Sequence, residues 1–395
     1  MNNNTKKILI ISGINHKNLG GAADFIKHFW DNTYHIGMKY NVELDFLYTN
    51  DFLPASISNF LTQGKILSTV QEIAKRLKIK NKIKNTDAVI VIHPQSIGYN
   101  RSVELLHYAK KIYYYTLDNS FFCRNSYNHL PEEFSACLRC LYGNFEQAII
   151  NNCKHHPINY TYPNGSDGDN FRTYLLKKQK EIYFLAQNDN QVQLLRKHFT
   201  EDKIKKVGLW VKDFDQLQNI KIKEIKRNHS LDFDVVFHGT DVPAKGFLWI
   251  IELCKAMPNI NVLIPARKPD GLIAPKNCLF RPMTWSTGLQ EAVESAAITI
   301  VPSLWSAPIE AALIKSVIFA PLTASVANET AYCTEISSNI ILKLDKTPAK
   351  AAEQLTIAIQ EKKTLNLQAK QEWLDEFITK NKFCIENIVK TIKED

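Results

Sequence analysis

A lysine and a glutamate in the second half of the sequence occupy positions from which they could bind a nucleotide. Lys245 lies in HGTDVPAKGF (238–247), between an apolar run typical of a buried strand and a helix-like segment. Glu310 lies in VPSLWSAPIEAALIKS (301–316), after another such run and near the start of a predicted helix. A lysine at a helix start can pair with a pyrophosphate, and a carboxylate can accept hydrogen bonds from both ribose hydroxyls. Glu310 alone could equally be an exposed helix acid in a favourable dipole position, but the two motifs together favour a nucleotide site.

A glycine-containing loop near the start of the chain is a second candidate for anion binding. SGINHKNLGGAADF (12–25) places Gly20 and Gly21 just ahead of a helix-like stretch, where backbone N–H groups can approach an anion. The spacing is not GxGxxG, since Gly13 and Gly20 are seven residues apart, and no acidic residue follows the second strand in the expected way. The sequence therefore disfavours a dinucleotide dehydrogenase, and a simple turn remains the alternative.

Four of the eight cysteines cluster with a spacing that is compatible with a tetrahedral zinc site. The pattern is C-x13-C-x2-C-x12-C, in which CLRC supplies the close pair. His129, His155 and His156 are nearby alternative ligands, and buried free thiols are the alternative interpretation. Eight cysteines in 395 residues are too dilute for a disulfide scaffold and favour a reducing compartment. The four candidate ligands are Cys123, Cys137, Cys140 and Cys153.

Two Asp-x-Asp strings raise the question of a catalytic metal. Asp167 and Asp169 lie in the turn-rich PNGSDGDN, and Asp232 and Asp234 open a predicted strand instead of ending one. A metal site needs oxygen ligands that converge, here at a strand end. We interpret both strings as turn and strand-entry residues and predict that catalysis needs no metal or other cofactor.

The elements that would position these residues form two series of alternating strands and helices. Such alternation predicts an α/β fold with parallel sheets covered by helices on both faces, and ligands then bind at the carboxyl ends of strands. The predicted strands are 6–13, 41–48, 87–93, 111–118, 147–152, 181–187 and 205–211 in the first series, and 233–239, 259–266, 278–282, 297–302, 316–321 and 338–344 in the second.

The two series predict two Rossmann-like, doubly wound domains that face a central cleft. The lysine-rich stretch 216–231 is the predicted linker between them. The predicted domains are 1–215, with an insertion at about 119–175, and 232–375, followed by a C-terminal helix over 376–395 that crosses back to the first domain.

Composition and charge narrow the class of protein and its partners. Apolar residues make up 45% and no run approaches 18 apolar residues, so we expect a cytoplasmic globular protein. The net charge of +9 favours anionic partners. Residues 71–84 carry six Lys and Arg against one acid, Glu72, so this segment is either a solvated basic helix or one that lies on anionic lipid at the inner membrane face. We expect no nucleic-acid partner.

With these residues in place, the chain resembles the retaining glycosyltransferases of GT-B architecture, of the family-four type that uses nucleotide sugars. The resemblance rests on ILIISG and LGGAADF near the start, the strand ends VIVIH and YYTLD, and FLAQNDNQVQLL and KVGLWVKDF. It continues through HGTDVPAKG and VPSLWSAPIEAAL in the second half. It implies a GT-B fold, transfer of a sugar with retention to a saccharide or lipid-linked acceptor, and a role in cell-surface polysaccharide or glycoconjugate synthesis.

The resemblance also assigns roles to residues. Lys245 neutralises the pyrophosphate and Glu310 holds the ribose, while Asp118 and His93 are further catalytic candidates at the two strand ends of the first domain. His93 could also be a satisfied structural histidine. The donor-binding residues that the resemblance implies are Gly20, Gly21, Gly239, Thr240, Lys245, Arg267, Arg281, Pro282, Ala307, Pro308, Ile309 and Glu310.

The chain departs from the family's pattern at three positions. Thr240 stands where the family has an arginine, with Arg267 or Lys268 available to supply the charge. Ala307 stands near the place of the family's first glutamate, and Leu117 stands where a histidine precedes the acid Asp118. These departures keep two alternatives open, a non-catalytic sugar- or nucleotide-binding relative and a nucleotide-sugar 2-epimerase.

Overall fold

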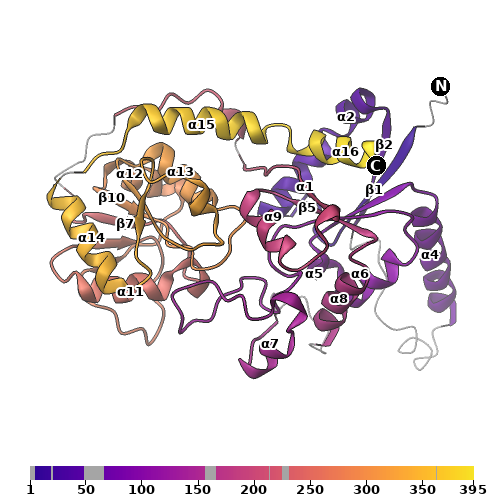
Figure 1. Cartoon of the computed structure of the whole chain (residues 1–395), viewed down its shortest axis with the longest axis horizontal. Coiled ribbons are helices and arrows are strands. Elements are labelled where there is room, and N and C mark those ends of the chain that lie inside the picture. The colour runs from indigo at the N-terminus through magenta and orange to yellow at the C-terminus, as the bar shows by residue number, and fades with distance from the viewer. Residues whose placement is uncertain are drawn as a thin grey trace. The chain divides into compact units, whose positions relative to one another are not determined.

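Two parallel six-stranded sheets, each flanked by helices, form the framework of the chain (Figure 1). The computed structural model describes residues 5–18, 21–48, 66–155, 166–212, 214–224, 231–361 and 363–395. The chain divides into two units. Unit 1 comprises Met1–Ser126, Arg139–Lys212 and Phe383–Asp395, and unit 2 comprises Tyr127–Leu138 and Asp213–Lys382.

The sheet of unit 1 has the strand order β2-β1-β3-β4-β5-β6. Ile8–Ile11 of the central strand β1 are at most 1% exposed, as expected for a parallel strand covered on both faces. The strands are β1 (Lys6–Ser12), β2 (Val42–Tyr48), β3 (Ala88–Ile92), β4 (Ile112–Tyr115), β5 (Ile182–Ala186) and β6 (Ile204–Lys206). The helices are α1 (Gly21–Asp31), α2 (Thr33–Tyr40), α4 (Ile66–Lys84), α5 (Pro94–Ile97), α6 (Tyr99–Leu106), α7 (Glu146–Ile150), α8 (Ser166–Lys177), α9 (Asp189–Arg196) and α16 (Cys384–Glu394), with 3-10 turns η2 (Leu141–Gly143) and η3 (Glu201–Lys203).

The sheet of unit 2 has the order β12-β11-β10-β7-β8-β9. Its first strand in sequence, β7, lies between β10 and β8, so the strand order reverses there. The strands are β7 (Val235–Phe237), β8 (Val262–Ile264), β9 (Cys278–Phe280), β10 (Ile298–Ile300), β11 (Thr323–Val326) and β12 (Leu342–Leu344). The helices are α10 (Phe214–Leu217), α11 (Phe247–Ala256), α12 (Leu289–Ser295), α13 (Ala311–Phe319), α14 (Pro348–Gln360) and α15 (Leu367–Asn381), with 3-10 turns η4 (Pro243–Lys245), η5 (Trp285–Thr287) and η6 (Tyr332–Glu335).

The last helix, α16, completes the core of unit 1 and lies beside α2 (Figure 1). Ile385, Ile388 and Ile392 are at most 1% exposed and belong to the same apolar cluster as Ile8 of β1 and Ile36 of α2. Spacings of three and four residues place these isoleucines on one helical face. The preceding helix, α15, belongs to unit 2, so the helical C-terminal stretch is divided between the units near Lys382.

Two predicted strands are helices in the structure. Residues 147–152 lie in and just after α7, whose Ile149 and Ile150 are 67% and 70% exposed. Residues 316–321 begin inside α13, and the strand of this region is β11, a few residues later. Both predictions were wrong for one reason, because a short apolar run rich in β-branched residues reads alike in a strand and in a helix.

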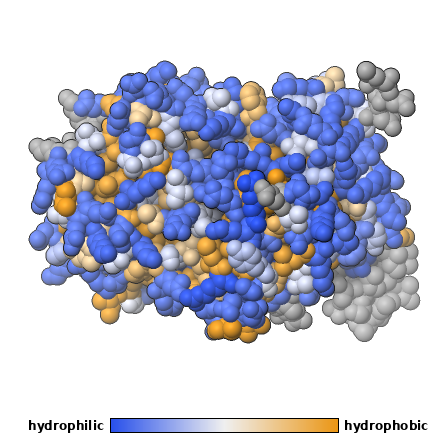
Figure 2. Space-filling view, in the orientation of Figure 1, coloured by the Kyte–Doolittle hydropathy of each residue, from blue (hydrophilic) through white to orange (hydrophobic). Residues whose placement is uncertain are grey.

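The surface drawn in Figure 2 is mostly hydrophilic, with apolar side chains gathered over α7. Within the described ranges no helix is both long enough and apolar enough to cross a membrane.

Candidate functional site

A cavity of about 460 Å³ opens in unit 2 beyond the carboxyl ends of β7, β8, β9 and β10. In open parallel sheets this edge, where the strand order reverses, is the usual place for a ligand. The cavity is lined by His238, Gly239, Thr240, Asp241, Lys245, Pro265, Ala266, Arg267, Met283, Trp285, Leu289, Glu310 and Ala312.

Lys245 and Glu310 form an ion pair in the wall of this cavity. The Nζ atom of Lys245 lies 2.6 Å from Oε2 of Glu310, and their side chains are 21% and 9% exposed. Ser303 donates a second hydrogen bond from its Oγ to the same oxygen. Lys245 ends η4, and Glu310 is the residue before the first turn of α13. Two residues from different loops thus place a cation and a carboxylate side by side at the sheet edge.

Two glycines near this pair stand where a side chain would not fit. Gly246 has φ +84°, and a Cβ atom there would lie 2.4 Å from Cβ of Pro302. A Cβ on Gly239 would lie 2.5 Å from Cζ of Phe237. A side chain at Gly246 would push the segment that carries Lys245 away from Pro302, and the backbone conformation there also favours glycine. A side chain at Gly239 would collide with the Phe237 ring.

His238 is a cavity residue that the sequence analysis did not select. Its ring stacks on Trp285 with centroids 5.3 Å apart, and its Nδ1 lies 2.9 Å from Oγ of Ser316. The Ser316 hydroxyl donates to the Ala312 carbonyl, so Nδ1 of His238 carries the hydrogen. Burial lowers the pKa of His238 to about 4, which keeps the ring neutral at pH 7. Its place directly after β7 and before Gly239 was the signal that could have identified it.

The remaining residues predicted for donor binding are distributed unevenly around the cavity. Thr240 and Arg267 are exposed and line it. Arg281 instead pairs with Asp232, and Pro282 is exposed; neither lines the cavity. Met283 and Trp285, slightly further along the same loop, take that place. Three further predicted residues, Ala307, Pro308 and Ile309, precede Glu310 in its loop. Ala307 and Pro308 are buried, and Ile309 is half-buried.

Asp118 and His93 lie after neighbouring strands of unit 1. Oδ2 of Asp118 accepts a hydrogen bond from Nε2 of Gln95 at 2.6 Å, and Oδ1 accepts one from the backbone N–H of Ser120 at 2.9 Å. His93 precedes α5 with φ +56°, and its carbonyl accepts hydrogen bonds from the N–H and the Oγ of Ser96. The structure gives Asp118 a polar, anchored position, and the catalytic roles of both residues stay predictions.

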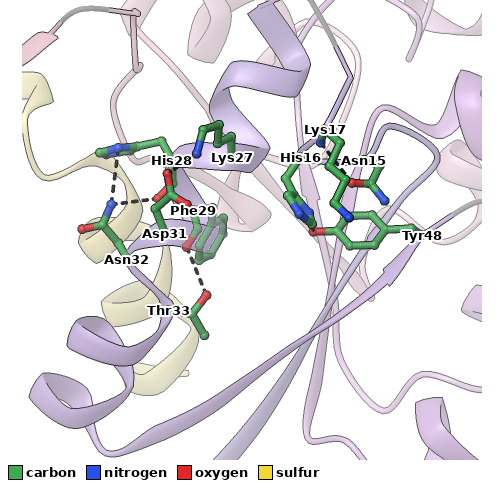
Figure 3. Close-up of polar contacts among 10 residues, drawn as sticks. All are labelled: Asn15, His16, Lys17, Lys27, His28, Phe29, Asp31, Asn32, Thr33 and Tyr48. Atoms are coloured by element: carbon green, nitrogen blue, oxygen red, sulfur yellow. Dashed lines mark hydrogen bonds and ion pairs between the residues drawn. The ribbon is translucent and has the colours of Figure 1, made fainter.

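The loop after β1 is braced by side chains that the sequence analysis did not single out (Figure 3). His16 lies beside Tyr48, the last residue of β2, with Nδ1 and Oη 3.2 Å apart. The His16 ring also stacks on Trp30, with centroids separated by 4.6 Å. Gly21 is exposed at the start of α1, and Gly20, also predicted to lie beside the donor phosphates, falls outside the described residues.

The four predicted zinc ligands are divided between the two units. Cys123, Cys140 and Cys153 belong to unit 1 and Cys137 belongs to unit 2. None of the four forms a disulfide bond with another described residue. Across the described ranges, no three His, Cys, Asp or Glu side chains gather in a way that could hold a metal ion, and the structure gives the zinc-site prediction no support.

The Asp-x-Asp strings have other partners in the structure. Asp169 lies in the first turn of α8, not in a turn-rich loop, and bridges Arg124 at 2.5 Å and Arg172 at 2.6 Å. The pKa of Asp169 is lowered, because the hydrogen bonds and charges of the two arginines outweigh its burial. Asp232 precedes β7 and pairs with Arg281. Both strings are therefore parts of ion pairs.

Comparison with solved structures identifies the fold. Anabaena Alr3699/HepE, crystallised with UDP-glucose, gives a TM-score of 0.54 at 12% identity, over 97% of this chain and 99% of that chain. A glycosyltransferase from Rickettsia africae ESF-5 gives 0.57 at 12% identity, over 99% and 98%. Sucrose-phosphate synthase from Thermosynechococcus elongatus gives 0.56 at 12% identity, over 98% of each chain. The sequence itself matches no protein-family profile and no curated protein.

These neighbours are GT-B glycosyltransferases. Their two Rossmann-like domains correspond to the two helix-flanked parallel sheets found here. The predicted GT-B fold class is confirmed. At 12% identity the likeness establishes the fold.

Proposed function

We propose that this chain is a retaining glycosyltransferase that transfers a sugar from a nucleoside-diphosphate sugar to a saccharide or lipid-linked acceptor. The observation that carries the proposal is the Lys245–Glu310 pair, 2.6 Å apart in the wall of a cavity of about 460 Å³. Ligand cavities usually measure roughly 300–1,000 Å³. The complexes of HepE with UDP-glucose and with UDP and glucose support a donor of this class.

Lys245 would stabilise the charge that develops on the leaving pyrophosphate. An ammonium group has three donors, of which one reaches Oε2 of Glu310, so two can serve phosphate oxygens. Arg267 adds a second cation from the loop after β8. Preorganised charge of this kind is usually the largest single contribution to catalysis. The neutral ring of His238 adds no competing charge at pH 7.

Glu310 would hold the ribose. Within the described residues, two side chains donate hydrogen bonds to the carboxylate of Glu310, and Oε2 accepts both of them. Oε1 can then accept hydrogen bonds from the ribose hydroxyls, while Lys245 and Ser303 fix the orientation of the carboxylate. The pair thus links recognition of the ribose to neutralisation of the phosphates.

The transfer step in this proposal needs little from side chains and no cofactor. The acceptor oxygen forms a bond to the anomeric carbon on the face from which the pyrophosphate oxygen departs. The acceptor proton passes to a phosphate oxygen of the leaving nucleoside diphosphate, so the step is balanced without a metal. Asp118 and His93, after β4 and β3 of unit 1, are the candidates for contacting the acceptor.

Product analysis with nucleotide sugars tests the proposal. Incubation with UDP-glucose and a panel of saccharide acceptors should release UDP and form a glycoside that keeps the anomeric configuration. Inversion at C2 of the sugar would instead identify a 2-epimerase. Binding of UDP without turnover would identify a non-catalytic relative, and absence of binding to any nucleoside diphosphate would contradict the nucleotide site itself.

We further propose that the acceptor is bound to a membrane, and the feature that supports this is helix α4. The basic side chains of this helix lie in its second half, from Lys75 to Lys84, where Leu77 is 52% exposed beside exposed Lys78. Other cations of α4 are engaged within unit 1, since Lys82 pairs with Asp45 at 2.8 Å and Lys80 lies 4.6 Å from the ring centre of Tyr108. Binding of α4 to an anionic lipid surface would bring unit 1 to a lipid-linked acceptor.

A further inference from the structure

A short segment of the first half of the sequence belongs to unit 2. Tyr127–Leu138 is part of that unit, although the residues on both sides of it belong to unit 1. The segment closes on itself. His129 and Ala136 form an antiparallel bridge, and the N–H of Cys137 donates to the carbonyl of Asn128 at 2.7 Å. We call residues 127–138 the inserted loop.

Asn128 attaches the inserted loop to the segment between β10 and α13. Its side chain is completely buried. Its Nδ2 donates to Oγ of Ser306 at 2.8 Å, and its Oδ1 accepts from the N–H of Ser306 at 3.0 Å. One carboxamide therefore binds both the side chain and the backbone of a single residue, an arrangement that fixes its position and orientation.

The residue next to Asn128 supports the lysine of the ion pair. The ring of Tyr127 meets that of Trp305 edge to face, with centroids 4.6 Å apart. The ring of Trp305 also lies beside Lys245, whose Nζ is 5.0 Å from the ring centre. Adjacent residues of the inserted loop thus contact Trp305 and Ser306, the first beside Lys245 and the second in the loop that leads to Glu310.

The loop that leads to Glu310 contains a conformation that must be held in place. Ser303, which donates to Glu310, has φ +42° and is 3% exposed. A left-handed conformation at a residue other than glycine persists where the surrounding structure enforces it. The two hydrogen bonds of Asn128 anchor this loop three residues after Ser303.

We propose that Asn128 is a positioning residue of the nucleotide site. It holds the Ser303–Glu310 loop in the conformation in which Ser303 and Lys245 both bind Oε2 of Glu310. The inference rests on the proposed function, since it assumes that the ion pair binds a nucleotide. Residues 126 and 139 join the inserted loop to unit 1 in the chain, so unit 1 is covalently linked at two points to the loop that carries Asn128.

Titration calorimetry with UDP tests the inference on the full chain. Asn128→Ala should raise the Kd for UDP roughly tenfold, since each lost hydrogen bond changes an equilibrium by a factor of about 2–10. Asn128→Asp should raise it less, because a carboxylate still accepts from the N–H of Ser306. Asn277→Ala is the matched control. It removes three hydrogen bonds from a buried asparagine to the carbonyls of Cys254, Met257 and Ile260, and should lower the Tm without changing the Kd.

Amide hydrogen exchange of the ligand-free chain gives an independent readout. Peptides that cover residues 301–310 should exchange faster in Asn128→Ala than in the wild type, and at the wild-type rate in Asn277→Ala. Equal exchange in all three proteins would overturn the inference, as would equal Kd values for Asn128→Ala and the wild type. If the wild type binds no UDP, the proposed function fails, and the exchange rates still decide whether Asn128 positions the loop.

Discussion

Lys245 donates to Glu310 across 2.6 Å although the two residues are 65 positions apart in the sequence. Each follows a strand, β7 or β10, and these strands are neighbours in the sheet. The parallel arrangement therefore brings a cation and a carboxylate to one edge of the sheet, where in the proposed function they bind the phosphates and the ribose of one nucleotide.

Removing either member of the pair should weaken nucleotide binding. We expect Lys245→Ala and Glu310→Ala each to raise the Kd for UDP roughly 10- to 100-fold, because a hydrogen bond to a charged group contributes about 1.5–3 kcal/mol. Titration calorimetry measures the affinity, and thermal denaturation checks the fold. Lys255→Ala, which removes an exposed lysine that pairs with Glu252, is the control in the same unit. Unchanged affinity in both variants of the pair would show that the donor assignment is wrong.

Acid should destabilise the protein through its buried histidines. Burial, with the nearby charge of Arg172, lowers the pKa of His198 to about 4, against an ordinary value of 6.5. Between these values the unfolded chain binds a proton that the folded chain does not. The stability that the neutral ring provides is therefore complete above pH 6.5 and is lost as the pH falls toward 4. One such histidine adds at most about 1.4 kcal/mol per pH unit to the slope of the free energy of unfolding against pH.

Urea denaturation at several pH values between 4 and 7.5 checks this expectation. His198→Asn keeps an acceptor for the N–H of Tyr142, which now donates to Nδ1 of His198 at 3.1 Å. The free energy of unfolding of this variant should fall less steeply with acid than that of the wild type. Parallel curves for the two proteins would rule out His198 as a source of the pH dependence.

Purified protein should contain little metal. The cysteines of the predicted zinc cluster are divided between the two units, so we expect elemental analysis to give less than about 0.1 zinc per chain. Affinity for UDP should be the same with and without EDTA. A stoichiometric metal, or loss of UDP binding in EDTA, would restore the zinc-site hypothesis.

Binding to anionic vesicles should depend on α4 and on salt. The change of five α4 lysines to glutamine should weaken co-sedimentation with phosphatidylserine-containing liposomes at low salt. Raising the ionic strength should weaken binding of the wild type, because the screening length falls to about 8 Å at physiological salt. The five positions are Lys75, Lys78, Lys80, Lys82 and Lys84.

A control variant that loses the same number of positive charges in unit 2 distinguishes an effect of α4 from an effect of net charge. It should bind vesicles like the wild type. Equal binding of both variants, or none by the wild type, would contradict a role for α4 at a membrane. The control changes five exposed lysines of unit 2 to glutamine: Lys255, Lys268, Lys276, Lys346 and Lys350.

The sequence predicted two residues of loops that join strands to helices and missed residues that depend on distant contacts. Lys245 and Glu310 could be found because each stands in a loop between an apolar strand and a helix. Asn128 could not be found in this way, since its partner Ser306 is 178 positions away. Trp285 begins the 3-10 turn η5 after β9, and its stacking on His238 is a contact that no local pattern encodes.

The fold class could be predicted because its signal, too, is local in the sequence. Parallel strands covered on both faces are continuous apolar runs, which made the α/β class evident. Residues 316–321 were assigned to a strand because α13 is buried on several sides and shows no polar face in that stretch. The periodicity of apolar residues distinguishes a strand from a helix when one face of the element is exposed to water. It does not distinguish them when every face is buried.

The place of α16 has a consequence for the order in which the protein is made and folded. Unit 1 is begun first on the ribosome, yet Ile385, Ile388 and Ile392, which fill its core beside β1 and α2, are synthesised after all of unit 2. Domains generally fold as units and N-terminal ones first during synthesis. Here part of the apolar core of the nascent first unit stays uncovered until α16 is made, and transiently exposed apolar surface of this kind favours aggregation.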